Sequence, residues 1–415
     1  SPSPPFTATS LAGDLAKRGH EVRVVTAPPY YPEWRRAKGY RSWRFYREVW
    51  NGCSVWRSPL WVPAKPTALT RILHLLSFAA SSLAVMIRQT FWRPDLVFVL
   101  EPPLFCAPAA LLVARLTGAI AWLHVQDFEV AAFFGLGFAR AGAFKGILVS
   151  IERWLTRRFD SVSTISRSMR DRIFRLGVTP EGTSLFPNWV DTERIRPDEP
   201  ADALLRSWGL AEDRKIVLYA GNMGKKQGLG IVLDVAAALQ SSRPDILFVL
   251  VGDGADRDEL VARARRDKLG NVVFKPVQPL PTLPALLNLA AVHLVVQRRG
   301  AADAVMPSKL TGILAAGGAA LITADAESEL GRFVEENPGI AVRVEPENPE
   351  ALLSELVSLA DDEGRRRSCG SAARAYAVSN LSIDAVLPAF EARAESLVKH
   401  LNTDGLPLKK NENIS

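Results

Sequence analysis

Residues 215–252 read KIVLYAGNMGKKQGLGIVLDVAAALQSSRPDILFVLVG, and this stretch decides the fold class. The apolar runs at 215–221 and 246–252 lack the alternation of a half-exposed strand, which indicates strands buried on both faces. Between them, residues 228–239 have the apolar spacing of an amphipathic helix. The order strand, helix, strand predicts a βαβ unit in a parallel sheet covered by helices.

The same alternation runs through the rest of the chain. We expect further strands at 21–27, 95–101, 119–125, 160–166, 272–276, 292–297, 319–324 and 340–346. A chain of 415 residues exceeds what one hydrophobic core usually supports. The predicted fold class is therefore α/β, with two Rossmann-like, doubly wound domains.

A segment rich in proline and charge, PNWVDTERIRPDEP at 187–200, marks the join between the domains. We predict a first domain over 1–190 and a second over 191–382. A C-terminal helix over 383–402 is expected to return to the first domain, and residues 403–415 to form a flexible tail.

The first recognisable element is a helix at about 7–18, whereas a Rossmann-like half normally opens with a strand. The sequence also begins at Ser1 without a methionine. We therefore expect the first strand of the N-terminal domain to be missing and the sequence to be incomplete.

Positive charge is concentrated in the first domain. Residues 1–190 hold 24 Lys and Arg against 12 Asp and Glu, and nine of the ten tryptophans. Basic and aromatic residues together favour an anionic membrane surface or nucleic acid, and a plain solvated basic face is the alternative. No nucleic-acid motif is present, so we expect a membrane surface, with the apolar stretch 133–148 docking on it, and no nucleic acid.

Three cysteines, Cys53, Cys106 and Cys369, are widely separated and unpatterned. This favours a reducing compartment, hence the cytoplasm or the inner face of the cell membrane, and argues against disulfides and zinc. No signal peptide is evident. The apolar run 72–87 is shorter than a spanning helix and contains His74, so we expect a buried or interfacial helix there.

Two loops follow strands at the carboxyl edge of the second domain's sheet. In GNMGKKQG (221–228), Gly221 and Gly224 allow a ligand to approach backbone N–H groups, and Lys225 and Lys226 can neutralise a phosphate. The next strand ends in VGDG, with Gly252 and Gly254. Each loop alone could be an ordinary turn, but their shared edge is where such sheets bind nucleotides.

A third segment at this edge is MPSKLTGILAAGGAALITA, residues 306–324. Pro307 and Ser308 open an apolar helix, and Lys309 lies in its first turn. Free N–H groups and the helix dipole attract anions at such an N-terminus, although Pro and Ser also start helices that bind nothing.

In the first domain, AWLHVQDF places His124 at the end of a buried strand and Asp127 three residues later. The histidine could orient a sugar hydroxyl, or it could be a hydrogen-bonded core residue. No metal-binding or hydrolase motif was found, so no metal site is predicted.

Seven segments in this order resemble the retaining family 4 glycosyltransferases of GT-B fold, of the colanic-acid and O-antigen type. They are GHEVRVVTAPPYYPEW (19–34), RPDLVFV (93–99), STISRSMRDRI (163–173), FPNWVDTERIRP (186–197), LYAGNMGKKQGL (218–229), VGDG (251–254) and MPSKLTGILAAGG (306–318). The resemblance covers about residues 5–400.

The resemblance implies that the second domain binds a nucleotide diphosphate sugar and the first domain binds the acceptor, a glycan or a lipid-linked oligosaccharide. Residues Gly221, Asn222, Met223, Gly224, Lys225 and Lys226 would line the diphosphate, and 273–277 would meet the base. Pro307, Ser308, Lys309 and Leu310 would contribute amides and a cation. His124 would lie beside the donor sugar, with Asp127 near it. No cofactor besides the donor substrate is implied.

The sequence departs from the family pattern at three places. Two family glutamates correspond to Ala304 and Gly312, a family lysine corresponds to Gln227, and PPFTAT (4–9) replaces a glycine-rich loop. With no carboxylate placed as a nucleophile, front-face attack assisted by the leaving phosphate is the expected mechanism. A UDP-sugar 2-epimerase and a catalytically inactive binding subunit are the alternatives.

Overall fold

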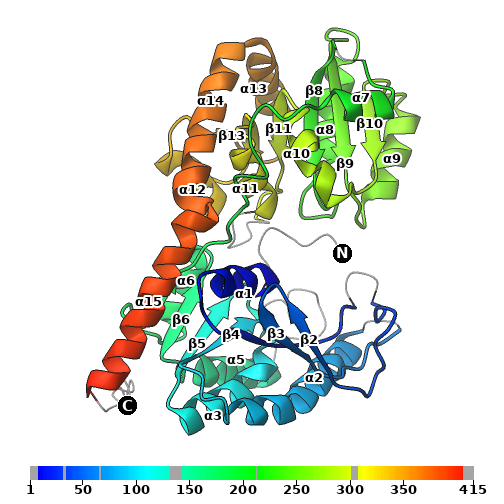
Figure 1. Ribbon diagram of the computed structural model, residues 1–415. Coiled ribbons are helices and arrows are strands. Elements are labelled where there is room, and N and C mark those ends of the chain that lie inside the picture. Colours follow the sequence, from blue (N-terminus) through cyan, green and yellow to red (C-terminus); the bar gives the residue numbers. More distant parts are fainter. Residues whose placement is uncertain are drawn as a thin grey trace. The chain divides into compact units, whose positions relative to one another are not determined.

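The computed structural model describes residues 8–30, 34–64, 67–130, 143–211, 213–300 and 307–404. Contacts divide the chain into two compact units (Figure 1). The N-terminal unit comprises the described residues up to Phe186 together with 389–404, and the C-terminal unit comprises Pro187–Pro388. The division falls inside α15 (Ile383–Asp404), at Pro388.

The C-terminal unit is built on one six-stranded, wholly parallel sheet of order β10-β9-β8-β11-β12-β13. Its strands are β8 (Lys215–Ala220), β9 (Ile246–Val251), β10 (Val272–Lys275), β11 (Val292–Val295), β12 (Ala320–Thr323) and β13 (Val342–Val344). Its helices are α7 (Asp202–Trp208), α8 (Gly230–Leu239), α9 (Arg257–Arg266), η2 (Leu280–Thr282), α10 (Leu283–Asn288), α11 (Ser308–Ala315), α12 (Glu329–Glu336), α13 (Pro349–Asp361), α14 (Glu363–Tyr376) and the π-turn η3 (Ala377–Leu381).

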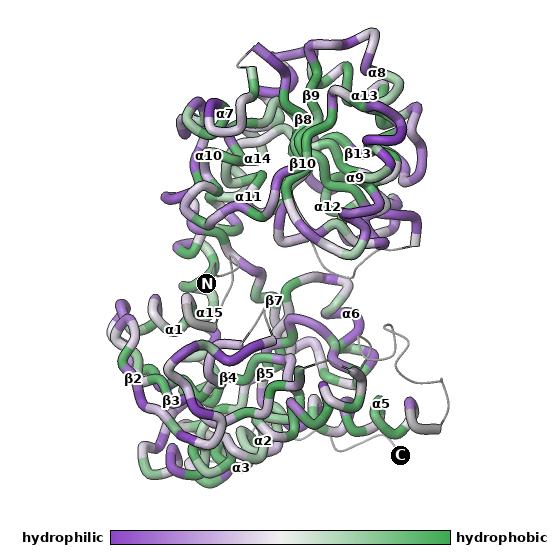
Figure 2. Tube along the Cα trace, turned by 90° about the vertical axis from the view of Figure 1, so that its right-hand side faces the viewer, coloured by the Kyte–Doolittle hydropathy of each residue, from purple (hydrophilic) through white to green (hydrophobic). Residues whose placement is uncertain are grey.

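Helices cover both faces of this sheet. Val217 and Tyr219 of β8 pack in one core with α8, α9 and α13, whereas the neighbouring residues Ile216 and Leu218 pack in another with α7 and α10. Figure 2 shows these strands as hydrophobic along their length. Burying an apolar side chain contributes about 1.5–3 kcal/mol. Because side chains on both faces of these strands are buried, both faces carry apolar residues and the sequence does not alternate between apolar and polar.

The N-terminal unit contains two separate sheets. One has the order β1-β3-β2, in which β1 (Arg23–Thr26) runs parallel to β3 (Cys53–Arg57) and β3 forms a hairpin with β2 (Tyr46–Trp50). The other is wholly parallel, with the order β4-β5-β6-β7: β4 (Leu96–Glu101), β5 (Ile120–Val125), β6 (Ser161–Thr164) and β7 (Thr183–Leu185).

The helices of this unit are α1 (Ala8–Lys17), α2 (Ala68–Gln89), η1 (Leu104–Cys106), α3 (Ala107–Thr117), α5 (Ala143–Thr156), α6 (Arg167–Arg175) and the C-terminal part of α15. Phe390 of α15 stacks on Trp122 of β5 with ring centroids 4.8 Å apart. Glu391 pairs with Arg18 at 3.1 Å and with His20 at 3.0 Å. These contacts fasten the last helix to the N-terminal unit.

The predicted α/β class with helix-covered parallel sheets is confirmed, and each predicted strand is present with slightly narrower limits. The prediction overlooked β2, β3 and β7. The apolar run 72–87 lies within α2, which extends beyond it at both ends and runs for 22 residues. Among the described helices, α2 alone has the length and apolar composition of a membrane span, with 17% of its most apolar window buried. Residues 1–7, 133–142 and 405–415 lie outside the described part, so the predictions made for them stay predictions.

Candidate donor and acceptor sites

Two glycine loops at the carboxyl edge of the C-terminal sheet are locked together by backbone contacts. The Met223 amide donates to the Asp253 carbonyl oxygen at 2.8 Å, and the Asp256 amide donates to the Met223 carbonyl oxygen at 2.9 Å. A Cβ atom at Gly252 would lie 1.9 Å from the Gly221 carbonyl oxygen. Met223 is fully buried. Gly252, Gly254 and Met223 therefore shape the loop, since each is needed for its close packing.

The second half of the loop is held by two residues that follow the lysines. Gln227 Oε1 accepts a hydrogen bond from the Gly224 amide at 3.1 Å, and the Gln227 amide donates back to the Gly224 carbonyl oxygen at 3.0 Å. Gly228 has φ +62°, and a Cβ there would collide with Arg298 at 2.4 Å. Lys225 and Lys226 are exposed at the tip. Gln227, which replaces a family lysine, thus has a structural role here.

Lys309 lies beside the start of this loop. Its Nζ is 4.2 Å from the centre of the Tyr219 ring, and a Cβ at Gly221 would lie 3.7 Å from Nζ. The Tyr219 hydroxyl donates to the Asn222 carbonyl oxygen at 2.5 Å, which fixes the ring under the amine. Burial lowers the pKa of Lys309 to about 8. In the part of the chain that the structure describes, no hydrogen bond or ion pair joins the Lys309 amine to another residue, so among these residues the amine has no anionic partner.

Helix α11 presents this lysine from its first turn. The Leu310 amide already donates to the Pro307 carbonyl oxygen at 2.9 Å, and the Leu310 side chain is fully buried. Of the first three amides of α11, those of Ser308 and Lys309 have no hydrogen-bond partner within the described residues. At the other end of the helix, Arg374 donates to the Ala315 carbonyl oxygen at 2.7 Å and complements the helix dipole.

The two positions that correspond to family glutamates differ in what the structure describes. Ala304 lies outside the described residues. Gly312 lies on α11, where a Cβ would approach Leu287 Cδ1 at 3.3 Å. A larger side chain at Gly312 would therefore have to displace part of the packing against α10.

His124 is fully buried in β5 of the N-terminal unit. Its Nδ1 lies 2.9 Å from Ser163 Oγ, and its Nε2 lies 2.7 Å from the Gln126 amide nitrogen. Because that amide group donates, Nε2 accepts and Nδ1 carries the proton of the neutral ring. The ring stacks on Phe98 at 5.7 Å, and burial lowers the pKa of His124 to about 3. Asp127, two residues beyond the strand, is exposed. These surroundings are those of a core histidine.

Three carboxyl groups close to the ends of β4 and β5 were not predicted: those of Glu101 and Glu152 are buried, and that of Glu129 is partly buried. The Glu129 side chain accepts from the Leu104 amide at 2.7 Å, and the Glu129 amide donates to Glu101 Oε1 at 3.4 Å. Glu152 of α5 is 1% exposed, and its nearest cation is Arg172 at 3.8 Å. Burial raises the pKa of Glu101, Glu129 and Glu152. Repulsion from nearby carboxylates raises it further: from Glu152 and Glu129 at Glu101, from Asp127 at Glu129, and from Glu129 at Glu152. The only sequence signal was a glutamate as the last residue of a strand, in EPP at 101–103.

Among the described residues, no group of three or more His, Cys, Asp and Glu side chains is arranged to hold a metal ion. Glu101, Glu129 and Glu152 are therefore carboxyl groups with raised pKa values, and they are not arranged to bind a metal ion.

Comparison with known proteins places these features in a family. The sequence matches the family described as glycosyl transferase 4-like domain over residues 6–189, and glycosyl transferases group 1 over 201–376. It is 47% identical over 345 residues to WcaI of Escherichia coli K12, a protein assigned as a colanic acid biosynthesis glycosyl transferase. This match covers 82% of this chain and 84% of WcaI.

Solved structures agree on the fold. The sucrose-phosphate synthase of Thermosynechococcus elongatus is similar with a TM-score of 0.70 at 16% identity, covering 94% of this chain and 92% of that one. Anabaena HepE, solved in complex with UDP-glucose, has a TM-score of 0.61 at 15% identity, covering 83% and 87%. The chain therefore belongs to the family 4 glycosyltransferases of GT-B fold.

Proposed function

We propose that this glycosyltransferase moves a sugar from a nucleotide diphosphate sugar, with retention, to a glycan or lipid-linked acceptor in bacterial surface polysaccharide synthesis. The role assigned to WcaI supports the pathway class, and the UDP-glucose complex of HepE supports the donor class. The observation that carries the proposal is Lys309, a partly desolvated amine beside the Gly221 loop and next to the amides of Ser308 and Lys309, which no other described residue bonds.

The chemistry follows from where charge develops. As the bond between sugar C1 and the phosphate oxygen breaks, negative charge grows on the departing diphosphate, which Lys309 and the amides of Ser308 and Lys309 stabilise. The acceptor hydroxyl attacks C1 from the same face, and its proton passes to the leaving phosphate oxygen. In this mechanism neither a protein nucleophile nor a metal ion is required.

A single incubation separates this function from its alternatives. The full chain is mixed with UDP- and GDP-sugars and with a lipid-linked or oligosaccharide acceptor, and products are followed by NMR. Transfer gives free nucleoside diphosphate and a product whose anomeric configuration matches the donor. An epimerised sugar without acceptor consumption would indicate the 2-epimerase, and nucleotide binding without either product would indicate an inactive subunit.

We also propose that the N-terminal unit docks on an anionic membrane at the cytoplasmic face, where a lipid-linked acceptor would lie. Of the 20 large apolar side chains exposed in the described residues, 18 belong to this unit. On α2, exposed residues recur at Leu69, Leu73, Leu76, Leu83 and Ile87, the spacing of a single helix face.

Two further helices extend this apolar face. Helix α3 packs on α2 and exposes Leu116, and α5 exposes Ile147, Ile151 and Trp154 along one stripe. In the sheet order β4-β5-β6, the connection through α3 and the connection through α5 each lead to the next strand in the same direction. Because connections between parallel strands are right-handed, α3 and α5 lie on the same face of the sheet. Arg158, 4.0 Å from the Trp154 ring, supplies positive charge at the edge.

Vesicle sedimentation tests this docking face. Binding to vesicles that contain phosphatidylglycerol should exceed binding to phosphatidylcholine vesicles and should weaken at high salt. The double variant Ile147→Glu/Ile151→Glu should lose most of the binding. The control Val378→Glu, at an exposed apolar residue of the C-terminal unit, should keep it. Equal binding by the double variant and the control would refute the docking face.

A further inference from the structure

Tyr219 lies near the end of β8, just before the loop 221–228. It is fully buried, and its ring packs in the same core as Val217 and Phe248. Its hydroxyl donates to the Asn222 carbonyl oxygen at 2.5 Å. Because core packing holds the ring and a hydrogen bond holds its outer end, the ring stays fixed beside the start of the loop.

The face of this ring carries the Lys309 amine. Nζ lies 4.2 Å from the ring centre, a distance at which an aromatic face attracts a cation. On the two loops beside it, the charged side chains of Lys225, Lys226 and Asp253 are exposed, and burial alone accounts for the lowered pKa of Lys309. Among the described residues, the Tyr219 ring is therefore the group that favours the charged form of this amine.

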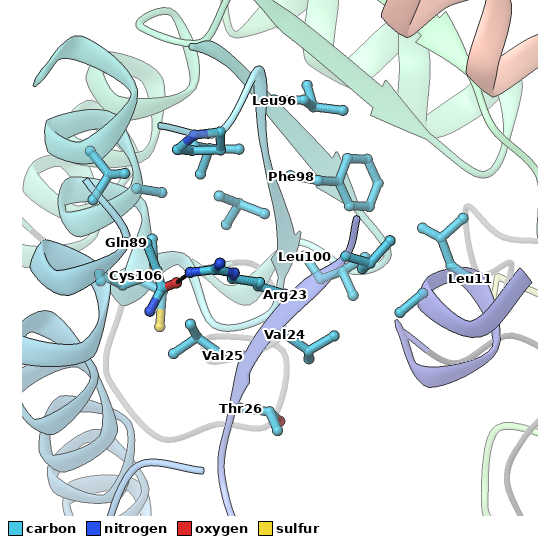
Figure 3. Close-up of a pocket in the computed structure, with 18 of the residues that line it drawn as sticks. Leu11, Arg23, Val24, Val25, Thr26, Gln89, Leu96, Phe98, Leu100 and Cys106 are labelled. Carbon is cyan, nitrogen blue, oxygen red and sulfur yellow. Dashed lines mark hydrogen bonds between the residues drawn. The ribbon is translucent and has the colours of Figure 1, made fainter. Parts of the chain in front are cut away.

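Arg23 of β1 shows how a structural cation is held elsewhere in the protein. Its guanidinium also lies 4.2 Å from a ring centre, that of Trp92. However, Arg23 pairs with Glu21 at 2.9 Å and donates to Gln89 Oε1 at 3.4 Å, the bond drawn in Figure 3. Within the described residues, Lys309 has the ring but neither the carboxylate nor the amide oxygen.

An aromatic ring suits a cation that must later meet a diphosphate. A carboxylate close to the amine would attract it strongly at partial burial and would also repel the incoming anion. A ring attracts the amine more weakly and carries no net charge. The amine can therefore stay protonated on the ring and still leave it for a diphosphate.

We propose that Tyr219 is a positioning residue for sugar transfer: its ring holds the charged Lys309 amine beside Gly221 until the diphosphate of the donor binds and takes the amine over. This role rests on the proposed contact of Lys309 with the diphosphate. A Cβ at Gly221 would lie 3.7 Å from Nζ and 3.7 Å from the Tyr219 hydroxyl, so glycine leaves this flank of the pair open to a ligand.

NMR of lysine side chains tests where the amine rests, without turnover. The full chain is labelled with ¹³C at lysine Cε, and the Lys309 signal is identified by its loss in Lys309→Met. In the free chain, the ring current of Tyr219 should shift the Lys309 ε protons upfield. Saturation with UDP or GDP should remove that shift. The Lys225 signal, from an exposed side chain, should show no upfield shift in either state.

Three variants separate the ring from the hydroxyl and from general core packing. Tyr219→Leu removes the ring, Tyr219→Phe keeps it, and Phe248→Leu removes a fully buried ring from β9 in the same core. Loss of the Tyr219 ring should lower the pKa of Lys309, about 8 in the wild-type chain, by about 1 pH unit. In Tyr219→Leu, kcat/KM for the donor should then fall about eightfold at pH 8.5 and change little at pH 6.5. The other two variants should keep the wild-type pH profile.

Three results would overturn the role of Tyr219. An absent upfield shift in the free chain would mean that the amine does not rest on the ring. A shift that persists with saturating nucleotide would mean that the amine does not move to the diphosphate. These two results need no Tyr219 variant, so they decide the matter even if Tyr219→Leu does not fold. The third is a wild-type pH profile in Tyr219→Leu.

Kinetics of Lys309→Ala show which proposal has failed. A lower kcat in Lys309→Ala together with a wild-type pH profile in Tyr219→Leu would keep the proposed role of Lys309 and remove Tyr219 from it. Unchanged kinetics in Lys309→Ala would remove the proposed role of Lys309, and the role of Tyr219 would fall with it. If neither UDP nor GDP bound, the proposed donor class would be wrong.

Discussion

At the scale of single residues, Lys309 combines a cation with an environment that disfavours its charge. Its pKa of about 8 leaves the amine largely neutral at pH 8.5. A bound diphosphate favours the charged form and raises that pKa, so binding must take up protons. We expect titration calorimetry with UDP and GDP at pH 8.5, in buffers of different ionisation enthalpy, to show proton uptake by the wild-type chain and none by Lys309→Met. Affinity should fall as pH rises above about 8.

His124 is expected to act mainly on stability. The folded-state pKa of about 3 lies below the ordinary value near 6.5. The unfolded chain therefore binds more protons between these values, so the stability that His124 contributes is present above pH 6.5 and is lost as the pH falls. His124→Gln should show a shallower loss of melting temperature from pH 7 to pH 5. His124→Ala should cost about 2–4 kcal/mol, by analogy with large-to-small core substitutions.

The outcome that would contradict this assignment is specific. A tenfold or larger loss of specific activity in His124→Ala, with an unchanged melting temperature, would place the ring at the donor sugar as the family resemblance implies.

At the scale of elements, helix α5 holds the buried carboxyl group of Glu152. Burial raises the pKa of Glu152, and no donor among the described residues bonds its carboxyl oxygens. A raised folded-state pKa means that the stabilising contribution is present at low pH and is lost as pH rises through that pKa. Glu152→Gln should therefore unfold at a higher temperature than wild type at pH 8 and at nearly the same temperature at pH 4.5. Glu335→Gln, at an exposed glutamate of α12, should change neither value.

The elements differ in how far the sequence predicts them. Buried parallel strands such as β8 and β9 were predictable because burial on both faces excludes polar residues. The hairpin β2–β3 was overlooked although Asn51-Gly52 carries a strong turn signal. Both residues have positive φ, 45° and 80°, as the tight turn requires. β2 is short, charged and largely exposed, and β3 is only five residues long with two buried side chains, so apolar runs could not reveal them.

The candidate site was predictable in its location and less so in the role of each residue. The order of strands and loops in the sequence predicted that the loop 221–228, Gly252 and Lys309 lie at one edge of the sheet, because the carboxyl ends of parallel strands all lie at that edge. Spacing could not show that Gly252 and Met223 serve loop packing, that Gln227 closes the loop, or that the Leu310 amide is already bonded. Those roles depend on contacts between segments far apart in sequence, and so does the cluster of Glu101, Glu129 and Glu152.

At the scale of the whole molecule, family membership and the fold rest on both units, while the assignment of acceptor and donor to them stays a prediction. The proposed mechanism stabilises the leaving group with an amine and backbone amides alone. Transfer should therefore persist at full rate after dialysis against EDTA and should not rise on addition of Mg²⁺ or Mn²⁺. A loss of activity with EDTA that Mg²⁺ restores would show that the diphosphate is held through a metal instead.

The most direct test of the account is the donor kinetics of Lys309→Ala beside those of Lys225→Ala. Charge on the diphosphate grows in the transition state, so Lys309 should count more there than in the ground state. Loss of an oxyanion-hole donor raises the barrier by about 2–4 kcal/mol, or roughly 30- to 1000-fold in kcat. We predict that fall in kcat for Lys309→Ala with a smaller change in KM, partial recovery in Lys309→Arg, and mainly a higher KM for Lys225→Ala, whose amine is exposed at the loop tip. Unchanged kcat and KM in Lys309→Ala would contradict the account, because Pro307 and Ser308 would then only start a helix.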